Sequence, residues 1–146
     1  MTVKITQALK NRLNEDGFNV EELCARFETW KLADEYSSYY FGKDSAYITP
    51  TVDGEKYKLR HVHLVPIEDK NQLSSWNKAW QLGKRKTSNR ILIYVDDNKG
   101  NFLLIFILSE PDAHEIALMK NEKHKKLMEG FAAVAEEFIF DGSILA

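Results

Sequence analysis

The stretch RILIYVDDNKGNFLLIFIL, residues 90–108, contains two apolar runs separated by a polar turn. Residues 90–95 and 101–108 are rich in Ile, Leu, Val and Phe, which favour buried strands. The DDNKG segment between them is typical of a hairpin loop, because Asp, Asn and Gly tolerate the backbone angles that such loops require. We therefore expect a central antiparallel hairpin on which the rest of the chain packs.

The sequence upstream of the hairpin predicts two helices and a further strand. Apolar residues at four-residue spacing favour a helix over residues 3–15, although its first residues also suit a short strand. Asn19 followed by Glu22 is a capping pair, and it predicts a second helix that runs to about Ser38. Tyr57–Val65 has the composition of a strand and is followed by a proline.

Two segments before the hairpin are harder to interpret. Residues 39–44 include Gly42, which indicates the end of the second helix and the beginning of a loop. Residues 67–88 show no clear pattern, but Trp76 and Trp80 are four residues apart and can anchor a short helix.

After the hairpin, Ser109 is expected to cap a helix, which the polar run 120–126 breaks or exposes. An apolar stripe over residues 127–138 then predicts a core-facing helix. This order of elements predicts an α+β fold in which N-terminal helices pack on a small antiparallel sheet, followed by a C-terminal helical segment. We expect residues 1–146 to form a single domain, because this is the usual length of one.

The sequence argues against a disulfide-stabilised, secreted or membrane-spanning protein. Cys24 is the only cysteine, so no intramolecular disulfide can form. The N-terminus has no apolar run of the kind found in signal peptides, and the longest apolar stretch, residues 102–108, is too short to span a membrane. We therefore expect a cytoplasmic protein without a membrane partner.

Positive charge is concentrated in one segment. Residues 56–90 contain nine basic and two acidic residues, a local charge of +7 in a chain whose formal net charge is −2. Such separation creates a local field that attracts anions. The segment is a candidate surface for a polyanion, with a solvated basic face as the ordinary alternative.

His61 and His63 are the first candidates for chemistry. They lie two residues apart on a predicted strand, so both side chains point to the same face. Paired imidazoles can bind a metal, contact phosphate, or act as acid and base. A metal site needs further ligands, and His114 and His124 are available only at a distance, which is a weak zinc pattern.

Basic clusters supply candidate phosphate ligands. The run Lys84-Arg85-Lys86-Thr87-Ser88 combines three cations with two hydroxyls, and such groups hold phosphate through charge and hydrogen bonds. A second cluster is His124-Lys125-Lys126. Together with the aromatic content, these clusters fit RNA better than a small anionic metabolite. The familiar phosphate-loop, hydrolase-elbow, zinc-protease and DNA-reading motifs are missing from the sequence.

Several segments, taken in order, resemble the YafO-type toxins of bacterial toxin–antitoxin systems over roughly residues 20 to 138. The segments that carry this resemblance are Phe41-Gly42-Lys43-Asp44, Arg60-His61-Val62-His63-Leu64, Lys86-Thr87-Ser88-Asn89, Leu92-Ile93-Tyr94, the apolar run 102–108, His114 and His124-Lys125. The resemblance implies a RelE-like, ribosome-dependent mRNA endonuclease that is inhibited by a cognate antitoxin. It implies mRNA on the ribosome and the antitoxin as partners, with no DNA binding by the chain alone.

The chemistry of such an enzyme can be stated from RNA itself. The 2′-OH of RNA is an internal nucleophile, so the protein needs no metal or cofactor. It has to accept the hydroxyl proton, stabilise the anionic phosphorane and protonate the leaving 5′-oxygen. The predicted catalytic residues are His61, His63, Lys86, His114 and His124. The predicted RNA- and phosphate-binding residues are Arg60, Lys84, Arg85, Thr87, Lys125 and Lys126.

Two alternatives use the same residues. The basic surface can serve a non-catalytic module that binds RNA or the ribosome. In the other alternative, His61 and His63 belong to a small metalloenzyme.

Overall fold

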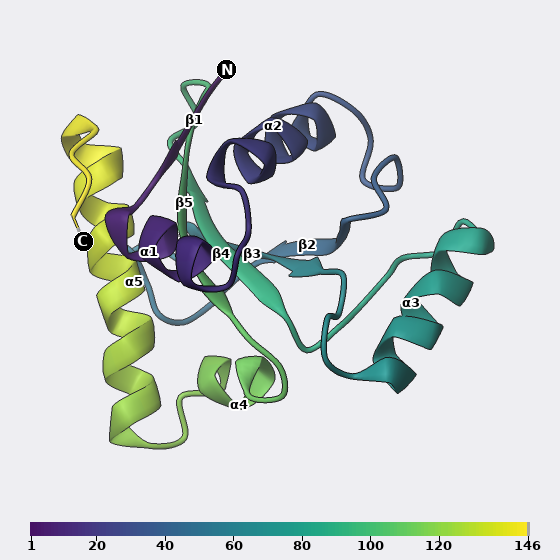
Figure 1. The fold of residues 1–146 in the computed structure, drawn as a ribbon. Helices are drawn as coiled ribbons and strands as arrows, with labels where there is room; N and C mark the ends of the chain where they lie inside the picture. Colours follow the sequence, from purple (N-terminus) through teal and green to yellow (C-terminus); the bar gives the residue numbers. More distant parts are fainter. Residues whose placement is uncertain (146) are drawn as a thin grey trace.

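A computed structural model describes residues 1–145 and contains one five-stranded sheet with helices on both faces (Figure 1). The strand order in the sheet is β1-β5-β4-β3-β2. The elements, in chain order, are β1 (Thr2–Ile5), α1 (Gln7–Glu15), α2 (Val20–Lys31), β2 (Phe41–Ala46), β3 (Leu59–Leu64), α3 (Lys70–Gln81), β4 (Ile91–Asp96), β5 (Asn101–Leu108), α4 (Ala113–Ala117) and α5 (Glu122–Asp141).

The predicted hairpin is confirmed as the centre of this sheet. β4 and β5 pair antiparallel, from Ile91 opposite Leu108 to Asp96 opposite Phe102. The Asp97 carboxylate closes the turn by accepting hydrogen bonds from the backbone N–H groups of Lys99 and Asn101. Every residue of β4 before Asp96 is buried, as expected for a strand that is covered on both faces.

The two faces of the sheet carry separate cores. α1 and α2 cover one face with a core that includes Phe27, Leu92 and Leu104. α4 and α5 cover the other face, where Met128 and Phe131 pack with apolar residues of β4 and β5 (Figure 1). The alternation of side chains along each strand sends successive residues to opposite cores. The predicted α+β class is confirmed.

The N-terminal segment differs from the single helix that its apolar spacing favours. Residues 3–15 do not form one helix, because residues 2–5 form β1, parallel to β5, and α1 begins only at Gln7. Thr6 separates the two elements. Its hydroxyl donates to the carbonyl of Ile105 and accepts from the N–H of Leu9, so it both anchors the strand and caps the helix. The sheet is therefore antiparallel except for this one edge pair.

The largest error of the sequence-based prediction lies between residues 31 and 46. α2 ends at Lys31 and not near Ser38, and the segment interpreted as the end of the helix contains the start of strand β2, paired with β3. Burial of Phe41 explains the difference. Its ring packs on Trp30 and Phe27, with centroids 4.8 and 6.0 Å apart, an arrangement that depends on contacts distant in the sequence.

Capping residues determine where the helices after β3 begin. α3 extends the predicted short helix, and the side chain of Asp69 caps its N-terminus. Ser109 caps no helix, because its hydroxyl accepts from Arg12 and α4 begins after Asp112. The polar run 120–126 does interrupt the helical segment, since Asn121 caps a new helix, α5.

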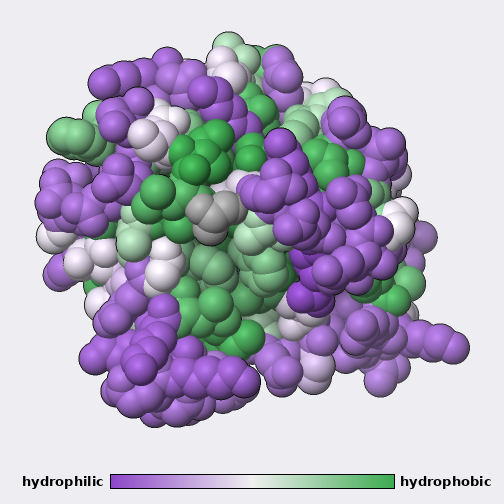
Figure 2. Space-filling model, turned by 60° about the vertical axis from the view of Figure 1, so that its left-hand side comes forward, coloured by the Kyte–Doolittle hydropathy of each residue, from purple (hydrophilic) through white to green (hydrophobic). Residues whose placement is uncertain are grey.

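Figure 2 shows hydrophilic side chains over most of one face, with apolar atoms gathered in a patch. Exposed apolar side chains around the end of α5 include Phe140, Ile144 and Leu145. Within residues 1–145, no helix is long and apolar enough to cross a membrane.

Gly42→Ala is expected to lower the free energy of unfolding by about 1–3 kcal/mol, because the added methyl group overpacks a closed contact. A Cβ at this position collides with the backbone carbonyl of Lys86 and lies 2.9 Å from the ring of Trp76. Urea denaturation measures the change. Gly130→Ala is the matched control, since Gly130 lies within α5 with no atom near its Cβ position, and this change should stabilise by about 0.5–1 kcal/mol. Equal stability of the two variants would contradict the role given to Gly42.

Candidate active site

Three histidines from two distant parts of the chain line one cavity of about 380 Å³. His61 and His63 lie on β3, opposite Ile93 and Ile91 of β4, and their side chains share the face that α4 and α5 cover. His114 reaches the same cavity from α4. The prediction that His61 and His63 face the same side is confirmed, and their ring centroids are 6.0 Å apart.

His63 is held through one ring nitrogen. Its Nδ1 lies 2.9 Å from the backbone N–H and 2.6 Å from the backbone carbonyl oxygen of Ser88. When Nδ1 is unprotonated it accepts from the N–H, and when it is protonated it donates to the carbonyl. The ring can therefore gain or lose a proton without turning, and the opposite nitrogen, Nε2, is left for the cavity. Burial lowers the pKa of His63, and the positive charge of Lys43 lowers it further.

His61 is more enclosed. Its Nε2 lies 3.0 Å from the hydroxyl of Ser45, and its ring stacks on Tyr47 with centroids 4.1 Å apart. Its Nδ1 is buried and has no hydrogen-bond partner in the described part of the chain. Burial, aided by the proximity of His63, lowers the pKa of His61 to about 4, so the ring is neutral at pH 7.

Acidification from pH 7 to pH 5 should therefore destabilise the protein through His61. Between its ordinary pKa of 6.5 and the folded value of about 4, the unfolded chain binds a proton that the folded chain does not. Stability consequently falls as the pH falls, by about 2 kcal/mol over this interval. Urea denaturation at both pH values measures the loss, which His61→Gln should reduce by about that amount. An unchanged pH dependence in this variant would show that His61 is not the group responsible.

The segment Ser88-Asn89 positions His114 as well as His63. The side-chain oxygen of Asn89 accepts from the backbone N–H of His114 at 2.8 Å, and its amide group donates to the carbonyl of Pro111. Nearby, the buried carboxylate of Glu110 accepts from three backbone N–H groups of the turn that precedes α3. These bonds tie the β5–α4 loop to the segments that precede α3 and β4, and fix the histidine at its end.

Lys43 is a site residue that the sequence analysis missed. It lies on β2 two residues before Ser45, on the histidine face, and its charge lowers the pKa of both His61 and His63. Residues 41–44 contribute to the resemblance to the toxin family, but the glycine among them predicts the end of a helix instead of a strand. An extended segment with Lys43, Ser45 and Tyr47 at alternate positions is the signal that could have placed it.

The structure places Lys86 outside this cavity. Its side chain is only 2% exposed, and its Nζ donates to the carbonyl of Ser38 at 2.7 Å. The ammonium group also lies 5.4 and 4.9 Å from the ring centroids of Trp76 and Trp80. Burial lowers its pKa, although Glu35 opposes the shift. This cation joins α3 to the loop that precedes β2.

The rest of the Lys84–Thr87 run is exposed. Arg85 forms an ion pair with Glu35: its Nη2 donates a hydrogen bond to Oε2 of the carboxylate, and its Nε lies 3.0 Å from Oε1. Lys84 and Thr87 flank this pair on the loop between α3 and β4.

Arg60 points away from the histidines. Its Nη2 lies 3.2 Å from the Asp44 carboxylate and its Nε donates to the hydroxyl of Tyr94, which in turn donates to Asp44. Lys31 completes this network from α2, 2.9 Å from the same carboxylate. Arg60 directly precedes His61 on β3, and successive side chains of a strand point to opposite faces, so Arg60 belongs to the other face of the sheet.

His124, Lys125 and Lys126 lie on the first turns of α5. The Nδ1 of His124 lies 3.3 Å from the side-chain amide of Asn121, and His124 is not among the residues that line the histidine cavity. Lys125 lines a neighbouring pocket, and Lys126 is exposed. Among residues 1–145, no group of three or more His, Cys, Asp or Glu side chains is arranged to hold a metal ion.

Comparison with known proteins gives one finding. A family model described as "Toxin YafO, type II toxin-antitoxin system" matches residues 28–140, a range that includes every residue of the histidine cavity. No curated protein and no solved structure gives a significant match.

Proposed function

Because the chain belongs to the YafO family of toxins from type II toxin–antitoxin systems, we propose that it is an endoribonuclease that cleaves mRNA on the ribosome. The observation that carries the proposal is the meeting of His61, His63 and His114 in one cavity, with Lys43 on β2 near enough for its charge to lower the pKa of His61 and His63. This arrangement supplies proton transfer and positive charge at one place, as RNA cleavage requires. We further propose that residues 1–146 act as one toxin domain in the cytoplasm.

His63 is the general base in this proposal. Its lowered pKa keeps the ring neutral at pH 7, and Ser88 can hold Nδ1 in either protonation state. Nε2 removes the proton from the 2′-OH, and the resulting oxygen attacks the adjacent phosphorus. The bond from phosphorus to the 5′-oxygen breaks, leaving a 2′,3′-cyclic phosphate on one fragment and a 5′-hydroxyl on the other.

His114 and Lys43 complete the reaction. His114, which lines the cavity from α4, is the proposed general acid that donates a proton to the leaving 5′-oxygen. The ammonium group of Lys43 stabilises the additional negative charge of the phosphorane. His61 stays neutral and, with Tyr47 stacked on it, forms a wall of the cavity. We assign Lys86 to the support of β2 instead of to the phosphate.

Two further surfaces fit the proposed partners. Lys84, Thr87, Lys125 and Lys126 are exposed and are proposed to contact phosphates of mRNA or ribosomal RNA. Membership of the family implies an antitoxin partner, and exposed apolar groups such as those in Figure 2 are typical of protein interfaces.

Primer extension on a translated transcript tests the proposal. Purified protein is added to the transcript with and without ribosomes, and expression in bacteria is followed in parallel for growth arrest. We expect new 5′-ends only where ribosomes are present. Growth arrest with intact transcripts would instead support a module that binds RNA or the ribosome without cleaving, and would refute the endonuclease.

A further inference from the structure

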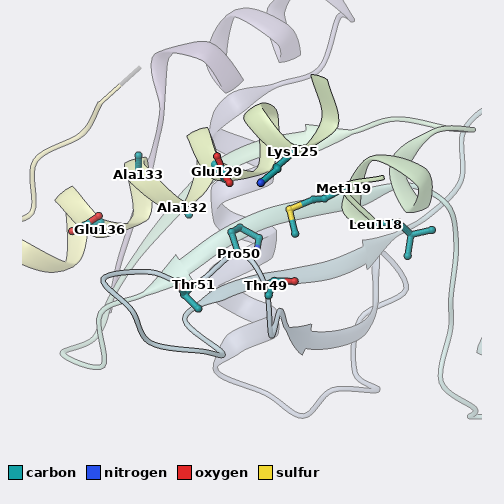
Figure 3. A pocket seen from close by; sticks show the side chains of 10 residues that line it. All are labelled: Thr49, Pro50, Thr51, Leu118, Met119, Lys125, Glu129, Ala132, Ala133 and Glu136. Carbon is teal, nitrogen blue, oxygen red and sulfur yellow. The ribbon is translucent and has the colours of Figure 1, made fainter. Parts of the chain in front are cut away.

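A second pocket of about 560 Å³ lies between α5 and the loop that follows β2 (Figure 3). Figure 3 shows the side chains of Lys125 and Glu129 on α5, facing the loop that carries Thr49, Pro50 and Thr51. The remaining lining residues come from the end of α4 and from later turns of α5: Leu118, Met119, Ala132, Ala133 and Glu136.

This pocket adjoins the histidine cavity. Thr49 and Leu118 line both, one from the loop after β2 and the other from the end of α4. A ligand that occupies the histidine cavity therefore meets the second pocket across these two side chains. A polymer whose phosphate lies against His63 and His114 can place its next unit there.

The lining suits a flat, partly apolar group with a polar edge. Pro50, Met119 and Ala132 provide apolar surface on which a ring can pack. The carboxylate of Glu129 offers hydrogen-bond acceptors, while the ammonium of Lys125 offers donors and positive charge. No ion pair joins these two side chains among the described residues, so both are available to a ligand.

We propose that this pocket binds the nucleobase of the RNA nucleotide next to the scissile phosphate, and that Glu129 selects bases that carry an exocyclic amino group. This inference rests on the proposed endonuclease function. Carboxylates accept hydrogen bonds from the amino group of cytosine, and adenine and guanine also carry one, whereas uracil does not. Lys125 then contacts the neighbouring phosphate. The pocket therefore favours A, G or C over U at this position.

Methyl NMR of the full chain tests the pocket without any cleavage. Protein with ¹³C-methyl methionine is titrated with cytidine or uridine 5′-monophosphate, a pair whose bases differ only at the amino position and the adjacent ring nitrogen. Met119 lines the pocket, whereas Met128 is buried in the core and serves as the internal reference. We expect a saturable shift of the Met119 methyl with the cytidine nucleotide and about tenfold weaker binding of the uridine nucleotide.

Glu129→Gln should abolish most of this difference, because the amide can also present a donor to the uracil carbonyl. Glu137→Gln is the matched control, since Glu137 is an exposed carboxylate on the same helix outside the pocket. Equal responses of Met119 to both nucleotides, or no response, would overturn the inference. Selective binding without cleavage of any transcript would uphold the pocket and refute the proposed function, so the two failures are distinguishable.

Discussion

His63→Ala should lower the rate of mRNA cleavage by about 10²–10⁴-fold while leaving the fold intact. The ring is the proposed general base, and the variant removes the imidazole that takes the 2′-OH proton. Its contacts to Ser88 are to backbone atoms of a loop that Asn89 and Gln72 also hold, so the segment keeps its support. Single-turnover cleavage of ribosome-bound mRNA measures the rate, and circular dichroism confirms folding.

His124→Ala is the matched control for this prediction. The sequence predicts His124 as a catalytic residue, but in the structure it lies beside Asn121 and is not among the residues that line the histidine cavity. We expect its cleavage rate to remain within about twofold of the parent protein, since surface substitutions have small effects. A folded His63→Ala protein that cleaves at the parent rate would refute the assignment of His63 as the base. An equal loss of cleavage rate in the His63→Ala and His124→Ala proteins would refute the claim that, of these two histidines, only His63 takes part in the reaction.

Lys43→Gln should lower kcat by about 10²–10³-fold with a smaller change in KM. Its charge is required mainly where negative charge develops on the phosphorane, and interactions made only in the transition state affect kcat. Lys43→Arg keeps the charge with a different shape, and it should recover part of the rate. Steady-state cleavage of ribosome-bound mRNA separates the two constants.

Lys78→Gln provides the comparison for Lys43. Lys78 lies within the basic segment 56–90, is exposed on α3, and is not among the residues that line the histidine cavity. Removal of its charge should raise KM slightly at most. If the two glutamine variants lose activity equally, positive charge acts only as a diffuse field and Lys43 has no special role in the transition state.

The central part of the fold follows from local patterns. The β4–β5 hairpin and the α5 stripe are predictable because each is specified by contiguous residues. β2 is not, because Gly42 and polar residues make it look like a helix end, and what holds it in the sheet is distant in the sequence: its pairing with β3 and the contacts of Phe41 with Phe27 and Trp30. The sequence of the first residues suits either a strand or the start of a helix. The hydroxyl of Thr6 decides for the strand, because it bonds Ile105 of β5 and caps the helix that begins after it.

The candidate site was predictable only in part. The i, i+2 spacing of His61 and His63 places both on one face, which needs no tertiary information. Whether a lysine is exposed or buried does depend on tertiary structure, and this is why Lys86 was grouped with a phosphate-binding run although it lies against Trp76 and Trp80. Lys43 was missed for the same reason, since its place beside the histidines depends on the pairing of β2 with β3.

The most direct test of the central claim is site-specific replacement of the RNA nucleophile. A transcript with a single 2′-deoxynucleotide at a mapped cleavage position is translated with the purified protein, and primer extension compares it with the unmodified transcript. If His63 activates the 2′-OH, the cut at that position should disappear while cuts elsewhere remain. An undiminished cut at the deoxynucleotide would contradict the account, because the attacking oxygen would then have to come from water or from the protein.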